Sequence, residues 1–214
     1  MSIITPGYDP LKLTAIVKKF ATRIGPDGVE ERRYYRFRGG RWYGGIATGD
    51  VVGCNLRCGF CWSWRDASHK MSEESFHRPD EVFRKLVSIA EKRGYEAIRL
   101  SGGEPTLSRN HVLSLLDFFS KTSYTFILET NGILIGVDTD YARELSKYSN
   151  LVVRVSIKGA NEEEFHMLTL ADPCFFQYQL KALKNLIDAG LEPGKRVYPA
   201  VMLSFSSIRS YKIL

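Results

Sequence analysis

Three of the four cysteines in this 214-residue chain fall within eight residues. Cys54, Cys58 and Cys61 follow the spacing Cys-x3-Cys-x2-Cys, which is too tight for a strand and too irregular for one helix face. A loop with this spacing can wrap three sulfurs around one inorganic group, and thiolates suit zinc or an iron–sulfur cluster. With no fourth ligand close behind, one metal position stays open, which is typical of a reactive site.

The rest of the chain predicts the scaffold that positions this loop. Short apolar strands alternate with helical patterns, which predicts right-handed βαβ units around a parallel sheet. Five βα units cannot close an eight-stranded barrel of about 250 residues. We therefore expect an α/β fold, an open partial (β/α) barrel of five to six βα units. The expected strands are 46–52, 95–100, 124–128, 151–157 and 196–203.

Unusual motifs follow four of these strands. They are the cysteines after the first, Gly102-Gly103-Glu104 after the second, the segment 129–132 (Glu-Thr-Asn-Gly) after the third, and Lys158-Gly159 after the fourth. Ligands of parallel α/β folds bind at the carboxyl ends of the strands. We therefore expect one site along this edge of the sheet.

The cysteine spacing after a strand, with Phe60 just before the last cysteine, resembles the signature of the radical S-adenosylmethionine (SAM) superfamily. The segment 101–105 (Ser-Gly-Gly-Glu-Pro) resembles the Gly-Gly-Glu motif of that superfamily. The resemblance covers residues 51–203. It implies a [4Fe-4S] cluster on the three thiolates, with SAM on the fourth iron. One electron from the cluster would cleave SAM to a 5′-deoxyadenosyl radical, which abstracts hydrogen from a substrate.

The same resemblance implies cofactor-binding roles for individual residues. Gly102 and Gly103 would let the backbone approach the methionine part of SAM closely. Glu104 would accept from its ammonium group, and Phe60 would lie near the adenine. The glycines would equally serve a tight turn between strand and helix.

A finer resemblance is to glycyl-radical-enzyme activating enzymes such as pyruvate formate-lyase activase. Their Asp-Thr-Asn-Gly segment and a strand ending in Asp-x-Lys hold a cation and the SAM carboxylate. Here Glu129 takes the place of the first acid and Ser156 that of the second, so the Arg154 guanidinium could supply the positive charge instead. Lys158 is expected to contact the SAM carboxylate. Glu129 and Arg154 could alternatively form a structural ion pair between strands.

Residues 1–45 are expected to form an extension packed on the core, with a β-hairpin that turns at Gly39-Gly40. Residues 46–214 would form the partial-barrel domain, without a complete sixth βα unit. The lateral opening would then be unusually exposed, or covered by the extension or by another chain.

The formal net charge of +6 and the pI near 9.1 favour anionic partners. An electron donor of the flavodoxin or ferredoxin type is expected, and nucleic acid is a weaker candidate. No apolar run approaches the roughly 20 residues of a membrane span. The first 20 residues lack an apolar signal core, so a cytoplasmic location without membrane contact is expected.

Two other functions compete with a radical enzyme. An iron–sulfur electron carrier would need a fourth thiolate, for which Cys174 is the spare cysteine. A zinc-stabilised nucleic-acid-binding module would need His69 or His77 to complete a Cys3His site. The substrate of a radical enzyme is not apparent from the sequence, and a protein glycyl or peptide site is one candidate.

Overall fold

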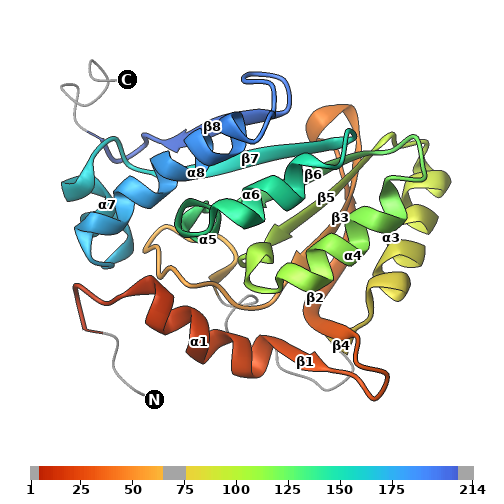
Figure 1. Ribbon diagram of the computed structural model, residues 1–214, viewed down its shortest axis with the longest axis horizontal. Helices are drawn as coiled ribbons and strands as arrows, with labels where there is room; N and C mark the ends of the chain where they lie inside the picture. Colours follow the sequence, from red (N-terminus) through yellow and green to blue (C-terminus); the bar gives the residue numbers. More distant parts are fainter. Residues whose placement is uncertain (1–4, 65–75, 207–214) are drawn as a thin grey trace.

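The structure is a computed structural model that describes residues 5–64 and 76–206. Among these residues, five strands form a parallel sheet in the order β3-β5-β6-β7-β8, which does not close into a barrel (Figure 1). The predicted α/β fold with an open partial barrel is confirmed. The strands are β3 (Ile46–Val51), β5 (Ala97–Gly102), β6 (Thr125–Thr130), β7 (Leu151–Lys158) and β8 (Val197–Met202).

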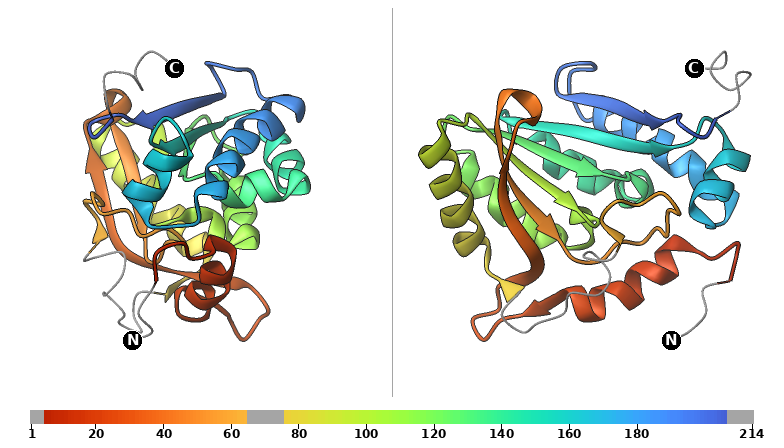
Figure 2. Two further views of the ribbon diagram at one scale, coloured as in Figure 1. Left: turned by 90° about the vertical axis from the view of Figure 1, so that its left-hand side faces the viewer. Right: turned by 180° about the vertical axis from the view of Figure 1, so that it is seen from behind.

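Helices cover one face of this sheet, and the view from behind in Figure 2 shows the other face. The first of them, α3, begins at Pro79 and is capped at its carboxyl end by Gly94, whose φ of 66° is favourable for glycine. Its residues Val82, Leu86 and Ala90, spaced four apart, are buried against the sheet. The helices are α3 (Pro79–Arg93), α4 (Arg109–Phe119), α5 (Ile133–Val137), α6 (Thr139–Ser146), α7 (Glu162–Thr169) and α8 (Phe176–Asp188), with 3-10 turns η3 (Pro105–Leu107) and η4 (Pro173–Phe175).

Alternation along β7 explains why the uncovered face of the sheet is polar. Every second residue, from Leu151 to Ile157, is buried with the helices. The residues between them are half-buried and point to the opposite face, where three of the predicted site residues therefore lie together on one strand. These residues are Val152, Arg154, Ser156 and Lys158.

The N-terminal strand arrangement differs in part from the prediction. The predicted turn at Gly39-Gly40 is wrong, because the long strand β2 (Glu30–Gly40) runs through both glycines, which pair with Ala47 and Ile46 of β3. Arg41 precedes the 3-10 turn η1 (Trp42–Gly44), which contains Trp42 and Tyr43. Strand β2 pairs antiparallel with β3 instead. The hairpin therefore adds β2 directly to the edge of the parallel sheet, with Arg36 opposite Asp50 and Arg38 opposite Thr48.

A helix that was not predicted, α1 (Pro10–Ala21), precedes this hairpin and lies along the lower edge in Figure 1. The Asp9 side chain accepts from the backbone N–H groups of Leu11 and Lys12, which caps the helix. Strand β1 (Thr22–Ile24) then pairs with β2, and β4 (Phe76–His77) pairs with β2 as well.

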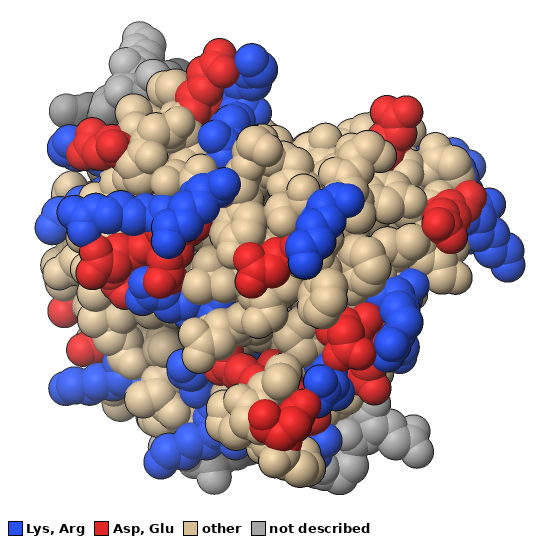
Figure 3. All heavy atoms as spheres, turned by 45° about the vertical axis from the view of Figure 1, so that its right-hand side comes forward, with Lys and Arg blue, Asp and Glu red and all other residues tan. Residues whose placement is uncertain are grey.

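On the face drawn in Figure 3, lysine and arginine side chains are interspersed with aspartate and glutamate instead of forming one basic patch. Ion pairs such as Arg84–Asp80 on α3 and Lys184–Asp188 on α8 likewise place opposite charges side by side. Within the described part of the chain, no helix combines the length and the apolar character needed to cross a bilayer. The segment 207–214, where a sixth strand was in question, lies outside the described residues.

Candidate active site

The thiol loop, residues 52–64, leaves β3 at its carboxyl end and carries three half-buried cysteines. Their sulfurs have polar neighbours. The Leu56 N–H donates to Cys54 Sγ at 3.3 Å, the Asn131 Nδ2 lies 3.9 Å from the same sulfur, and Ser63 Oγ lies 3.4 Å from Cys61 Sγ. Hydrogen bonds of this kind stabilise anionic sulfur and tune iron–sulfur clusters.

Burial raises the pKa of the Cys54 thiol to about 12, and the Glu104 carboxylate and the Cys58 thiol add to this effect. Burial also raises the pKa of Cys58, which the nearby Lys158 ammonium partly offsets. Thiolates in such a place need a strongly cationic partner, because deprotonation is otherwise unfavourable. The donor set therefore fits an iron–sulfur cluster.

A mononuclear zinc site fits less well. Among the described residues, no three Cys, His, Asp or Glu side chains converge closely enough to hold one metal ion. A cubane places its thiolates on different irons, so its ligands stand farther apart than those of one zinc ion. Of the histidines proposed for zinc, His77 lies on β4 against the Phe37 ring, and His69 falls outside the described residues.

The remaining cysteine, Cys174, is exposed on η4 beside Asp172, whose carboxylate raises the pKa of the thiol to about 11. It is not in the thiol loop.

The Gly-Gly-Glu segment is bonded to the backbone that leads into the thiol loop. The Gly103 N–H donates to the Val51 carbonyl and the Glu104 N–H to the Gly53 carbonyl, both at 2.8 Å. A Cβ at Gly103 would lie 2.2 Å from the Gly53 carbonyl oxygen, and one at Gly102 would lie 2.9 Å from the Val51 nitrogen. The chain's own backbone thus occupies the space that these glycines leave.

The Glu104 carboxylate joins the ends of β5 and β6 and is only 1% exposed. Its Oε1 accepts from the Thr106 N–H and hydroxyl and from the Thr130 hydroxyl, at 3.1, 2.7 and 2.7 Å. Its Oε2 accepts from the Asn131 N–H at 2.7 Å. Each carboxylate oxygen offers about two acceptor positions. Among the described residues Oε1 accepts three bonds and Oε2 only one, so Oε2 keeps the position for the predicted ammonium contact.

Two buried amides that the sequence did not reveal complete this framework. Asn55, in the thiol loop, accepts from Asn131 Nδ2 at 2.7 Å. Gln179 of α8 donates to the Asn131 and Ser156 carbonyls at 2.6 and 3.0 Å and accepts from the Lys158 N–H at 3.0 Å. These bonds fix the ends of β6 and β7 relative to each other and to the thiol loop.

Three other predicted residues come together at the end of β7. The Lys158 ammonium donates to the Ser156 hydroxyl at 2.7 Å and lies 5.8 Å from the centre of the Phe60 ring. Because the Lys158 charge partly offsets the burial that raises the pKa of Cys58, this group lies beside the thiol loop. The Phe60 ring in turn packs 5.7 Å from the Phe205 ring.

Glu129 and Arg154 lie deeper along the strands. Arg154 precedes Lys158 by four residues, about 13 Å along β7. Glu129 Oε1 accepts from Arg154 Nη1 at 3.4 Å, Arg99 Nη1 at 3.3 Å and the Tyr43 hydroxyl at 3.0 Å. The ion pair foreseen as an alternative is therefore present, and it sits away from the group at the strand end.

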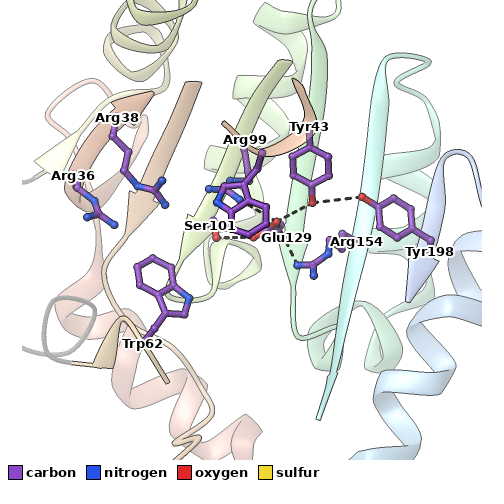
Figure 4. A pocket seen from close by; sticks show the side chains of 10 residues that line it. Arg36, Arg38, Tyr43, Trp62, Arg99, Ser101, Glu129, Arg154 and Tyr198 are labelled. Carbon is purple, nitrogen blue, oxygen red and sulfur yellow. Dashed lines mark hydrogen bonds and ion pairs between the residues drawn. The ribbon is translucent and has the colours of Figure 1, made fainter. Parts of the chain in front are cut away.

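This ion pair lines a cavity of about 780 Å³ on the polar face of the sheet (Figure 4). Arg36, Arg38 and Trp62 form one side of it, while Tyr43, Arg154 and Tyr198 lie on the other, with Ser101 and Glu129 between them. Trp62 directly follows Cys61, so the cavity begins beside the thiol loop.

Residues 50–204 match the family model of the radical SAM superfamily. The chain belongs to the radical SAM superfamily. This radical SAM protein is accordingly an enzyme, and its cofactors are a [4Fe-4S] cluster and SAM.

Curated relatives of this radical SAM protein include GTP 3′,8-cyclases. That of Petrotoga mobilis is 28% identical over 144 residues, which cover 66% of this chain and 42% of the relative. The probable GTP 3′,8-cyclase of Thermoplasma volcanium is 30% identical over 142 residues, covering 66% and 40%. The chain spans less than half the length of these relatives.

Solved structures share its fold. Streptococcus suis SuiB bound to the precursor peptide SuiA has a TM-score of 0.60 at 18% identity, covering 78% of this chain and 34% of SuiB. TYW1 with a lysine-pyruvate adduct has a TM-score of 0.52 at 18% identity, covering 73% and 54%.

Proposed function

We propose that Cys54, Cys58 and Cys61 hold the cluster of this enzyme and leave its fourth iron to SAM. The observation that carries this proposal is the set of three thiols in one loop at the carboxyl edge of the sheet. The sulfurs of Cys54 and Cys61 have N–H and O–H neighbours, and burial disfavours the metal-free thiolates of Cys54 and Cys58.

When bound, the cluster and SAM supply a one-electron cleavage of the sulfonium C–S bond, giving methionine and a 5′-deoxyadenosyl radical that takes a hydrogen atom from the substrate. The chain's own residues orient the cofactor. We assign the SAM carboxylate to Lys158, which the Ser156 hydroxyl holds in place. We assign the ammonium to the available position on Glu104 Oε2, and the adenine to the neighbourhood of Phe60.

The remaining predicted residues either support the thiol loop or face the substrate. Gly102 and Gly103 hold the backbone that enters the thiol loop. Glu129 and Arg154 belong to the cavity, about 13 Å along the strand from Lys158. That separation favours a contact with the substrate over one with the SAM carboxylate.

Two substrate classes follow from this assignment. The curated relatives are GTP 3′,8-cyclases, so a purine nucleotide is the first substrate to test. A protein glycyl or peptide site, as in activating enzymes, is the second. An electron donor of the flavodoxin or ferredoxin type would supply the electron, and the net charge of +6 suits the acidic surface of such donors.

Anaerobic reconstitution with iron and sulfide, followed by electron paramagnetic resonance of the reduced protein, tests the assignment. We expect a [4Fe-4S] signal that changes when SAM is added. Cys54→Ala, Cys58→Ala and Cys61→Ala should lose it, while the matched control Cys174→Ala should keep it. A signal that depends on Cys174 and ignores SAM would support an electron carrier instead.

A further inference from the structure

The arginines that line the cavity beside the thiol loop pair with two carboxylates, and each carboxylate is shared by two arginines. Asp50 is fully buried and accepts from Arg36 Nε at 2.8 Å and from Arg38 Nε at 2.7 Å. Glu129 is shared by Arg99 and Arg154 in the same way. Each trio therefore keeps one uncompensated positive charge, so the cavity as a whole attracts an anion.

Three of these arginines keep N–H groups for a ligand. Arg36, Arg38 and Arg154 have side-chain exposures of 39%, 24% and 34%. Within the described part of the chain, Arg154 makes its hydrogen bond through Nη1 alone, so its Nε and Nη2 remain to donate. A guanidinium offers five N–H donors in a planar fork, which matches a carboxylate or a phosphate group.

The rim of the cavity is aromatic. Trp42 and Trp62 are 69% and 68% exposed, which is unusual for the largest apolar side chains. The Trp62 ring already lies 5.8 Å from the Arg36 guanidinium and 5.9 Å from that of Arg38. An exposed indole next to fixed cations is a stacking surface for a planar ring.

Backbone strain points to the same place. Tyr43 has a φ of 56°, a left-handed conformation that a tyrosine seldom adopts. In this conformation its hydroxyl donates to Glu129 at 3.0 Å and lies 3.5 Å from the Tyr198 hydroxyl. Strained residues of this kind concentrate at ligand sites, where the surrounding contacts hold them.

We propose that this cavity is the substrate site, and that the substrate is a small planar aromatic molecule carrying an oxyanion. The oxyanion bonds to the free N–H groups of Arg154, while the ring stacks on Trp62 and accepts a hydrogen bond from Arg36 on that side of the cavity. The volume of about 780 Å³ lies in the range of small-molecule sites and accommodates a molecule of nucleotide size. The inference rests on the proposed function, because only that function makes a ligand here a substrate.

Isothermal titration of the anaerobically reconstituted protein tests the proposal. The probes are GMP and quinoline-2-carboxylate, each with its neutral counterpart, guanosine and quinoline, and inorganic phosphate as an anion without a ring. We expect an anionic ring to bind at least about tenfold more tightly than its neutral counterpart and than phosphate. The probe that binds tells a phosphate-bearing substrate from a carboxylate-bearing one.

Variants locate the binding. Arg36→Gln and Arg154→Gln should each weaken binding of the anionic ring about 10- to 100-fold, because each removes a charged hydrogen bond. Trp62→Leu should weaken binding of the ring-bearing anion and leave the affinity for phosphate unchanged. The matched control Arg84→Gln, at an exposed position of α3, should leave the affinity for every probe unchanged.

Equal affinity for charged and neutral probes, binding of neither anionic ring, or full affinity in Arg36→Gln and Arg154→Gln would overturn the proposal. These outcomes are separable from a failure of the proposed function. Cleavage of SAM without substrate, measured as 5′-deoxyadenosine in the same preparation, reports on the cluster alone.

Discussion

Replacement of Gly103 by alanine tests whether the Gly-Gly-Glu segment holds the thiol loop through the backbone. The added Cβ would lie 2.2 Å from the Gly53 carbonyl oxygen and 2.8 Å from that of Val51. Both contacts are with backbone atoms, so neither can be relieved by a side-chain rotation. The Gly53 carbonyl would have to move away by about 1 Å to reach a normal contact distance, in an interior that is packed closely.

The expected loss of stability follows from the hydrogen bonds that this movement breaks. The hydrogen bonds from Gly103 N–H to Val51 and from Glu104 N–H to Gly53, both 2.8 Å long, cannot persist. Two net backbone hydrogen bonds and the overpacking together amount to about 2–5 kcal/mol. This loss is large compared with a typical total stability of about 5–15 kcal/mol.

Urea unfolding of the metal-free protein, followed by circular dichroism, measures the loss, and iron analysis after reconstitution measures cluster retention. We expect Gly103→Ala to lower the unfolding midpoint and to reduce bound iron. Gly59→Ala is the matched control in the same loop, because a Cβ there meets nothing within 4 Å. If Gly103→Ala unfolds at the same urea concentration as Gly59→Ala, the backbone anchoring described above is wrong.

Three further predictions concern buried polar groups. Glu104→Gln should lower the free energy of unfolding in urea by about 1–3 kcal/mol, because its amide nitrogen would face the Asn131 N–H or the two threonine donors. An unchanged unfolding midpoint would contradict these hydrogen bonds. Gln179→Ala should lower both stability and cluster retention, since it breaks three bonds to backbone groups at the end of β7 and just after β6, whereas the exposed control Gln177→Ala should do neither. Burial lowers the pKa of His111 from 6.5 to about 3, so its neutral ring contributes stability above pH 6.5 that is lost as the pH falls toward 3. His111→Gln should flatten that part of the stability profile measured by urea unfolding, and an equally steep acid loss in the variant would refute the assignment.

The strands were predictable because each is a short apolar run between turn residues. The expected strand 151–157 is observed as Leu151–Lys158, and its alternation already assigns Arg154, Ser156 and Lys158 to one face. The helix α1 was missed although the signals are present. Asp9 caps it, Pro10 opens it, and Leu13 and Val17 are spaced four residues apart on its buried side.

The sequence predicted only those site residues that belong to local motifs. The motifs do meet at one edge, because parallel strands bring their carboxyl ends together. Depth along a strand was not predictable, so Glu129 and Arg154 were expected beside Lys158 although they line the cavity. Asn55 and Gln179 carry no local signal, because their importance arises only when distant strand ends come into contact.

The central claim is that the thiol loop supports reductive cleavage of SAM. The most direct measurement is anaerobic incubation of the reconstituted protein with SAM and dithionite, with 5′-deoxyadenosine and methionine quantified by chromatography. We predict that both products form in equal amounts, and that Cys58→Ala forms neither. A wild-type preparation with full cluster content that forms no 5′-deoxyadenosine, with or without purine nucleotides, would contradict the claim.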